Sequence, residues 1–395
     1  MQPGSVPLVR VPAGSVPALK DAASPQEALV AVMAGKGTWE DVDGVAEQPW
    51  GRSILPLREH ITFACRMEQT RESPDRSTYG PFEGMLEDPR LVAEVAERFG
   101  PDYRWSVTRF NDYLTCPFRF AAAHVLGLER RAEPEEGLES AGRGRIYHDI
   151  LSQAGQGWIL AQRPLATDHE KAILEALHHA IDEVLAHAPA RYGFAPGAFW
   201  GWEQADVRRR LVQAIRRAVR EGGEWAAFRP VEVEKGFGIG ADSENGPLCL
   251  ETPAGPVLVV GRVDRVDLHQ SGRLALLDYK SSSKVRALRD TLEGRDVQLS
   301  LYVLAVEQVI RPGTRVERAA FFHLGSGKYS PPLTDRERDR ALAVLMDRIT
   351  EVVTSVRGGA FPVRPIRACP RSCPFATICR VQRAQPAPGS TPRSG

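Results

Sequence analysis

Two aspartates and a lysine at the ends of two neighbouring predicted strands are the residues of this sequence best suited to chemistry. Asp264 lies in the run Gly-Arg-Val-Asp-Arg, and Asp278 and Lys280 follow in the run Asp-Tyr-Lys. Residues two apart on a strand share a face, so Asp278 and Lys280 project together. If the two strands form an antiparallel hairpin, the carboxylates of Asp264 and Asp278 can meet. Such a pair forms an oxygen-rich site for Mg²⁺ or Mn²⁺, and the lysine could activate water and stabilise phosphate charge.

Each of these residues, and each polar residue that could join them, also has an ordinary structural explanation. An Asp-x-Lys run is common, and by itself it indicates only solvent-facing charge. His148 alone fits a structural histidine, whereas Gln298 and Tyr302, four apart on one helix face, fit helix packing. Glu232 and Glu234 border a predicted strand; one could reach the metal, but a surface carboxylate is the better interpretation of both.

A second candidate site is formed by cysteines. Three of the six cysteines crowd the C-terminal end of the chain: Cys369, Cys373 and Cys379. With the distant Cys116 they supply four thiolates, which can hold a 4Fe-4S cluster or one zinc ion, and spacing alone does not separate these two. A site of this kind would close a loop of about 250 residues, so a structural role is the simplest. Cys65 and Cys249 stand apart and fit ordinary core or surface thiols.

A predicted helix over 203–222 is dense in arginine. Arg209, Arg216 and Arg220 share one face of it, and guanidinium groups match the geometry of phosphate. These three residues are therefore candidate DNA contacts, although a solvated helix face is the slightly better interpretation.

The run Gly325-Ser326-Gly327-Lys328 invites comparison with a phosphate-binding P-loop. Phe322 stands where the first glycine of that motif belongs, and Tyr329 stands where serine or threonine is required. We therefore interpret the run as a loop that follows a strand.

The elements that must position these residues follow from hydrophobic periodicity and turn signals. Helices are predicted first, over about 91–99, 106–124, 143–190 and 203–222. A run of strands comes next: Val231–Ile239, Leu248–Glu251, Val257–Leu268 and Arg273–Tyr279. A helix over 294–310, a strand over Ala319–Leu324 and a helix over Asp335–Arg357 complete the order. This order predicts an α/β (α+β) fold with a mixed central sheet flanked by helices.

The composition of the 395 residues is that of a globular protein, with 43% hydrophobic and 26% charged residues. The net charge is only +1, so any DNA-binding surface must come from local clustering of basic residues. No stretch of eighteen apolar residues and no secretory signal is evident, and we expect a cytoplasmic protein. Clustered cysteines in that reducing compartment bind metal more often than they form disulfides.

The motifs, taken together and in order, resemble the RecB-like branch of the PD-(D/E)XK nucleases. That branch carries Gly-x-x-x-His, Gly-x-x-Asp-Arg, Asp-x-Lys and Gln-x-x-x-Tyr elements, which match Gly144…His148, Gly261…Arg265, Asp278…Lys280 and Gln298…Tyr302. The resemblance implies a restriction-endonuclease-like core with a helical insertion. It implies a catalytic Lys280, with Gln298 and Tyr302 near the active site and the DNA strand. It also implies four metal ligands: His148, Asp264, Asp278 and the Tyr279 carbonyl. Val263 stands where the superfamily's name has proline, as is usual in this branch.

The cysteine pattern and the run Cys116–Phe120 resemble the C-terminal nuclease region of AddB-type helicase–nuclease subunits, over about residues 50–385. This resemblance implies a 4Fe-4S cluster held by Cys116, Cys369, Cys373 and Cys379. It implies a partly irregular lead-in over 1–100, a nuclease domain over 101–385 and a disordered tail over 386–395. The helicase-like portion of the family has no counterpart here. A stand-alone nuclease, a split subunit and a truncated protein therefore stay open, and unwinding would come from a partner such as an AddA-like helicase subunit.

The expected function is hydrolysis of DNA phosphodiester bonds by an Mg²⁺-dependent exonuclease that acts on single-stranded ends during double-strand-break repair. A CRISPR-associated end-trimming nuclease would share the motifs, but the AddB-like lead-in around Pro81–Glu97 disfavours it. A non-catalytic, cluster-stabilised DNA-binding subunit of a helicase complex is the alternative from another class. The intact Asp264, Asp278 and Lys280 argue against that alternative.

Overall fold

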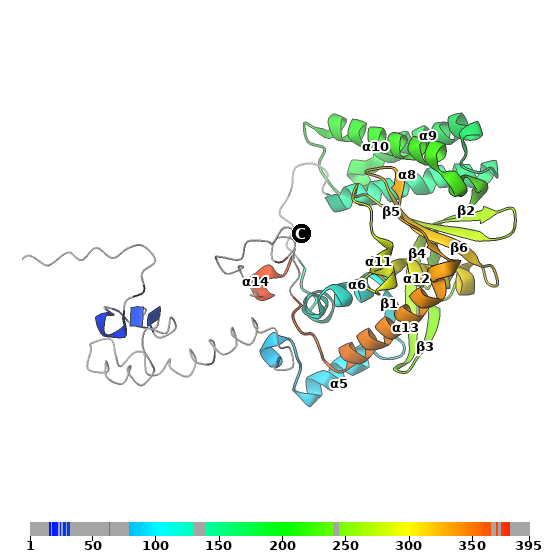
Figure 1. Ribbon diagram of the computed structural model, residues 1–395. Coiled ribbons are helices and arrows are strands. Elements are labelled where there is room, and N and C mark those ends of the chain that lie inside the picture. The colour runs from blue at the N-terminus through cyan, green and yellow to red at the C-terminus, as the bar shows by residue number, and fades with distance from the viewer. Residues whose placement is uncertain are drawn as a thin grey trace, which may run out of the picture. The chain divides into compact units, whose positions relative to one another are not determined.

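The computed structural model of the chain describes residues 79–129, 140–239, 245–364 and 373–379, with Cys369 and scattered positions before residue 64 (Figure 1). Two compact units are present: Gly84–Arg380 is one, and Met1–Glu83 with Val381–Gly395 is the other. The second unit contributes the short 3-10 helices Leu19–Asp21 and Pro81–Glu83. Cys65 and the predicted disordered tail lie outside the described residues.

A mixed sheet with the strand order β1-β4-β5-β6-β7 forms the centre of the larger unit. Its long strand is β4 (Gly255–His269), which pairs with β5 (Leu274–Lys280) as the predicted antiparallel hairpin. β5 then runs parallel to β6 (Val316–His323). The remaining strands pair with β4 or β6: β1 (Arg104–Ser106), β2 (Phe228–Phe237), β3 (Leu248–Thr252), β7 (Lys328–Tyr329) and β8 (Leu333–Thr334).

Helices cover both faces of this sheet (Figure 1). One face packs against α5 (Pro89–Arg98), α6 (Val107–Thr115), α12 (Gln298–Ala305) and α13 (Asp335–Arg357). The other packs against α8 (Ser140–Ala161), α9 (Glu170–Tyr192) and α10 (Trp200–Glu221). Shorter helices are α7 (Pro117–Phe120), α11 (Leu288–Leu292) and α14 (Ala376–Cys379). The predicted mixed sheet flanked by helices is confirmed.

Alternation along β5 separates the two helical layers. Leu274 and Leu276 belong to the core under α12 and α13, whereas Tyr279 belongs to the core under α8, α9 and α10. Asp278 and Lys280 therefore face the α12 side of the sheet, because successive residues of a strand point to opposite faces. Every residue of β5 before Lys280 is buried, as expected for a strand covered on both faces.

The predicted helix over 106–124 is wrong in one respect, because it breaks at Cys116. Ser106 caps α6 as expected, with its side chain accepting a hydrogen bond from the Arg109 N–H. Cys116 is extended, with φ −161° and ψ 111°, and α7 begins at Pro117. Steric conflict with the proline ring disfavours helical backbone at the preceding residue, so the break has a local cause.

None of the described helices combines the length and apolar character that a membrane span needs.

Candidate active site

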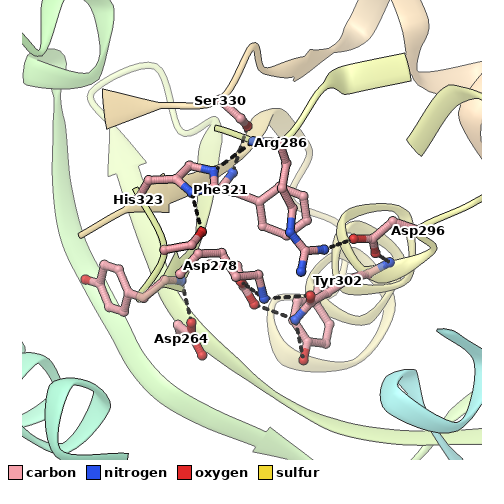
Figure 2. A network of polar contacts seen from close by, with 12 residues as sticks. Asp264, Asp278, Arg286, Asp296, Tyr302, Phe321, His323 and Ser330 are labelled. Carbon is pink, nitrogen blue, oxygen red and sulfur yellow. Dashed lines mark hydrogen bonds and ion pairs between the residues drawn. The ribbon is translucent and has the colours of Figure 1, made fainter. Parts of the chain in front are cut away.

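The β4–β5 hairpin brings the two predicted carboxylates together. Arg265 pairs with Leu277 in the antiparallel register, so Asp264 and Asp278 lie at the same position along the hairpin. The Tyr279 N–H donates a hydrogen bond to Asp264 Oδ2 at 2.6 Å, and both aspartates are buried (Figure 2). This geometry follows from strand pairing alone, as the sequence predicted.

Two further side chains join Asp264 from other elements. His148, on α8, places Nδ1 3.4 Å from Asp264 Oδ1 and 3.3 Å from Glu234 Oε1, where Glu234 belongs to β2. One ligand atom from each of these three residues lies within 4.8 Å of the other two. Within the described parts of the chain, no other histidine, cysteine, aspartate or glutamate residues form such a group.

Glu234 is one of the two glutamates that could reach a metal according to the sequence, and the preferred interpretation of it as a surface carboxylate is wrong. Its side chain is only 19% exposed, and its backbone has a φ of +49°, which non-glycine residues rarely adopt. Val233 pairs with Arg265 and Lys235 with Val263, so Glu234 lies across from Asp264. Glu232 and Glu234 are two residues apart, so strand alternation alone assigns both side chains to the same face of β2. In the structure, however, Glu232 forms an ion pair with Arg311 at 2.5 Å.

The residues of this group suit one divalent cation. In an octahedral shell at about 2.1 Å, neighbouring ligand atoms lie about 3 Å apart, and the two distances from His148 Nδ1, 3.3 and 3.4 Å, are close to that spacing. Carboxylate oxygens with one imidazole nitrogen suit Mg²⁺ or Mn²⁺. Asp278 Oδ2 is buried and forms an ion pair with Lys280 Nζ, which lies 2.5 Å away.

Electrostatics at the group also favour added positive charge. Burial raises the pKa of Asp278, and the nearby charge of Asp264 raises it further, against the opposing effects of Lys280 and His148. Burial alone would lower the pKa of His148, but hydrogen bonds and charge from Asp264 and Glu234 raise it to about 10. In the absence of a metal, a protonated His148 thus compensates part of the carboxylate charge.

Lys280 is held in place by the first residue of α12. Lys280 Nζ donates to Gln298 Oε1 at 2.8 Å, and Gln298 Nε2 donates to Asp278 Oδ1 at 2.6 Å. Gln298 Nε2 also lies 3.4 Å from the Tyr302 hydroxyl, one turn further along the same helix face. Gln298 therefore contacts Asp278 and Lys280 directly and fixes the orientation of both, whereas Tyr302 reaches them through Gln298.

A further layer of polar contacts positions Gln298 (Figure 2). Asp296 accepts a hydrogen bond from the Gln298 N–H at 3.0 Å and pairs with Arg286. The buried His323, at the end of β6, accepts from the Arg286 N–H at 3.1 Å and contacts Ser282 Oγ at 3.3 Å. Burial lowers the pKa of His323, which keeps this imidazole neutral and able to accept that hydrogen bond. The loop after Lys280 is thereby tied to β6 and α12.

The three predicted DNA-contacting arginines lie on α10. Arg209 pairs with Asp206, whereas Arg216 and Arg220 pair with Glu170 at 3.3 Å and 2.8 Å. The ion pairs and hydrogen bonds described for these arginines do not involve His148, Glu234 or Asp264.

Cys116 lies beside the chain segment that leads to Cys369. Its Sγ accepts a hydrogen bond from the Arg364 N–H at 3.4 Å, and Arg364 Nη1 donates to the Leu114 carbonyl at 2.8 Å. The Tyr113 hydroxyl donates to the Ala360 carbonyl at 2.7 Å. The start and end of the larger unit are thus in contact at this point, whereas Cys249 lies exposed on β3.

Comparison with known proteins places this site in a family. A model of the PD-(D/E)XK nuclease superfamily matches residues 104–380, a range that includes His148, Glu234, the Asp264–Lys280 hairpin and Gln298, as well as Cys116 and the three C-terminal cysteines. The chain is also 31% identical over 228 residues to an ATP-dependent helicase/deoxyribonuclease subunit of Desulforudis audaxviator, covering 55% of this chain and 19% of the relative. The protein of the same name from Moorella thermoacetica is 30% identical over 233 residues, with the same coverage.

The chain spans about a fifth of the length of these relatives. The family match, in contrast, covers more than half of the chain and contains the whole hairpin on which Asp264, Asp278 and Lys280 lie. This chain belongs to the PD-(D/E)XK nuclease superfamily.

Proposed function

We propose that this protein is a metal-dependent deoxyribonuclease, an exonuclease that hydrolyses phosphodiester bonds at single-stranded DNA ends during double-strand-break repair. The observation that carries the proposal is the spacing of His148, Glu234 and Asp264, whose ligand atoms lie within 4.8 Å of one another. The hairpin that supplies Asp264 also presents Asp278 and Lys280. The relatives' name includes a deoxyribonuclease, which agrees with DNA as the substrate.

In the proposed mechanism, a divalent cation and Lys280 have separate roles. His148, Glu234 and Asp264 would hold Mg²⁺ or Mn²⁺, with Asp278 and the Tyr279 carbonyl as the further ligands that the family resemblance implies. The bound ion supplies positive charge against the charge that develops on the phosphate, and it acidifies water. Lys280 Nζ, oriented by Gln298 and Asp278, would position the attacking water and donate to a phosphate oxygen.

We also propose that Cys116, Cys369, Cys373 and Cys379 hold a 4Fe-4S cluster with a structural role. The contact of Cys116 Sγ with the Arg364 N–H supports this proposal, because it brings the distant thiol next to the chain segment that leads to the other three. Four thiolates are the ligand set that such a cluster requires, and they would also suit zinc.

The helicase function in the relatives' name suggests the partner. We propose that an AddA-like helicase subunit supplies single-stranded ends to this nuclease in the cytoplasm, since the relatives are named as subunits of a helicase/deoxyribonuclease.

The test is digestion of end-labelled single-stranded and double-stranded DNA by anaerobically purified protein. We expect Mg²⁺-dependent cleavage that EDTA removes. Asp278→Ala and Lys280→Ala should lower the rate by at least about a hundredfold while the fold and DNA binding persist, because water and phosphate are no longer positioned. Lys171→Ala, an exposed lysine on α9, is the matched control. Wild-type cleavage by a folded Asp278→Ala variant would refute the proposal.

A further inference from the structure

Two hollows adjoin α10, one on each side of the Arg209–Gln213 face. The larger, of about 710 Å³, lies between α9 and α10 and includes Gly201, Arg208, Arg209, Gln213 and Arg216 in its lining. The smaller, of about 310 Å³, lies between α10 and the turn at 324–327 after β6. Arg209 and Gln213 line both, so the hollows meet at these two side chains and together form one track across α10.

The turn after β6 places the smaller hollow beside the strand of the catalytic lysine. The Leu324 N–H donates to the Lys280 carbonyl at 2.8 Å. A Cβ on Gly325 would meet the Ser283 backbone nitrogen at 2.7 Å, so this close approach requires glycine. On its other side the turn touches α10, where a Cβ on Gly327 would lie 3.0 Å from Ala214 Cα. The turn is therefore wedged between α10 and the segment that follows Lys280.

The lining of the track is rich in guanidinium groups. α10 carries six arginines and three acidic residues, a net charge of +3 for the helix. All the arginines except Arg220 line one hollow or the other. Arg210 pairs with Asp206, and Arg217 pairs with Glu221 at 2.8 Å, yet their side chains remain 40% and 39% exposed. A guanidinium group has five N–H donors, so a carboxylate on one side leaves donors for a phosphate on the other.

Exposed aromatic side chains stand at the other end of the track. Gly201 lines the larger hollow, Trp202 follows it directly, and Phe199 lies two residues before it. The side chains of Phe199 and Trp202 are 78% and 67% exposed. Such exposed aromatic rings beside a basic groove can stack on the faces of unpaired bases. This stacking does not depend on the base sequence.

We propose that this track is the path of a single DNA strand toward the active site. Arg210 and Arg217 bind a phosphate in the smaller hollow, Arg209 binds between the hollows, and Trp202 stacks a base at the far end. The path rests on the proposed function for the identity of its ligand. It also changes the set of DNA contacts predicted from sequence, because Arg220 lines neither hollow, whereas Arg210 and Arg217 do.

The first test measures the salt dependence of DNA binding. A fluorescein-labelled single strand of about 20 nucleotides is titrated in EDTA, which prevents cleavage. The double variant Arg210→Gln/Arg217→Gln should lose about 0.7 from the slope of log affinity against log salt, since the one single-strand phosphate contact in the smaller hollow is lost. Arg220→Gln, the matched control on the same helix, should keep the wild-type slope. An unchanged slope in the double variant, or an equal loss in the control, would overturn the path.

Two other variants probe the track without removing any arginine. Ser326→Asp adds a negative charge to the turn, and it should weaken binding of the single strand at about 0.1 M salt by about tenfold. Trp202→Ala should lower affinity for the single strand by about fivefold or more and leave duplex affinity unchanged, because duplex bases are not free to stack. Wild-type affinity in Ser326→Asp would mean that the smaller hollow holds no phosphate and that this basic face docks an acidic protein instead.

Binding and cleavage of the single strand are measured separately, so that this inference and the proposed function can fail independently. If the wild-type protein cleaves DNA and the arginines prove dispensable for binding, the path is wrong and the nuclease assignment stands. If binding depends on these arginines but no phosphodiester is cleaved, the nuclease assignment is wrong and the path stands.

Discussion

At the scale of single residues, Glu234 completes the candidate metal site that His148 and Asp264 begin. Its left-handed backbone, with φ +49°, turns the carboxylate from β2 toward His148 and Asp264. A non-glycine residue in this region costs about 1–3 kcal/mol, and such strain persists where the surrounding structure enforces it. Arg262 Nη1, 3.7 Å from Glu234 Oε2, provides an additional but exposed ionic contact. The strained residue and the candidate metal ligand are thus the same residue.

The first prediction concerns metal affinity. Glu234→Gln removes one anionic ligand and should weaken Mn²⁺ binding, measured by calorimetry, by at least about tenfold, since even residues behind the ligands contribute that much in metal sites. Glu232→Gln is the matched control, because Glu232 binds Arg311 and lies outside the ligand group. Equal Mn²⁺ affinity in the two variants would exclude Glu234 as a ligand.

The second prediction concerns backbone strain at the same position. Glu234→Gly and Glu234→Gln both lose the carboxylate, but only glycine adopts a positive φ without steric cost. In metal-free protein, the free energy of unfolding of Glu234→Gly should therefore be about 1 kcal/mol higher than that of Glu234→Gln. This difference allows for the greater entropy of glycine in the unfolded chain. Urea denaturation measures the difference, and a Gln variant as stable as the Gly variant would show that the position is unstrained.

At the scale of elements, β4 places functional or buried polar side chains on both faces of the sheet. Asp264 joins the carboxylate group, whereas the next residue, Arg265, is turned to the opposite face, under α8–α10. There Arg265 Nε and Nη2 donate to both carboxylate oxygens of Asp267 at 2.7–3.1 Å, and Nη1 donates to the Tyr279 hydroxyl at 3.3 Å. Arg265 and Asp267 are only 4% and 1% exposed. The side chain of the arginine that follows Asp264 in the motif therefore belongs to a buried ion pair on the opposite face of the sheet from the candidate metal ligands.

The third prediction follows from this buried ion pair. Asp267→Asn leaves the guanidinium of Arg265 buried without a counter-charge, and it should lower the free energy of unfolding by about 3–5 kcal/mol. The double variant Arg265→Met/Asp267→Leu replaces both charges with apolar side chains and should recover most of that loss. Urea denaturation of the three proteins measures both effects. A double variant less stable than Asp267→Asn would show that the pair is needed for more than mutual neutralisation.

At the scale of the whole molecule, the larger unit is closed by contacts between its two ends. Tyr113, Leu114 and Cys116 at the end of α6 contact residues 360–364, which follow α13. The break between α6 and α7 exposes the Cys116 sulfur to the Arg364 N–H. A metal centre at this junction would close a loop of about 250 residues and reduce the entropy of the unfolded chain.

The fourth prediction tests the cluster at this junction. Protein purified without oxygen should contain about four irons per chain and absorb in the visible blue. Cys116→Ala should lower the iron content and the thermal midpoint together, because the link between the two ends is lost. Cys249→Ala and Cys65→Ala are the controls and should keep the wild-type iron content. Stoichiometric zinc without iron would reject the iron–sulfur assignment, and full metal content in Cys116→Ala would reject the four-cysteine site itself.

The sequence alone determined the parts of this protein that depend on local periodicity. Alternation predicted β4 and β5, and the short turn between them implied the hairpin that aligns Asp264 with Asp278 and puts Lys280 on the same face. The strand and helix order predicted the mixed sheet between two helical layers. These features need only the period of a strand or helix and a tight turn, which neighbouring residues specify.

Only the tertiary structure decided which residues from distant segments complete the site. His148 and Glu234 are 86 residues apart in sequence, and they meet because α8 packs across β2 with one particular register of β2 on β4. The placement of Arg210 and Arg217 beside the turn after β6 likewise depends on how α10 packs against that turn. Periodicity specifies which face of an element a side chain occupies, but the neighbour of that face is set by long-range packing and strand register, which a local pattern does not contain.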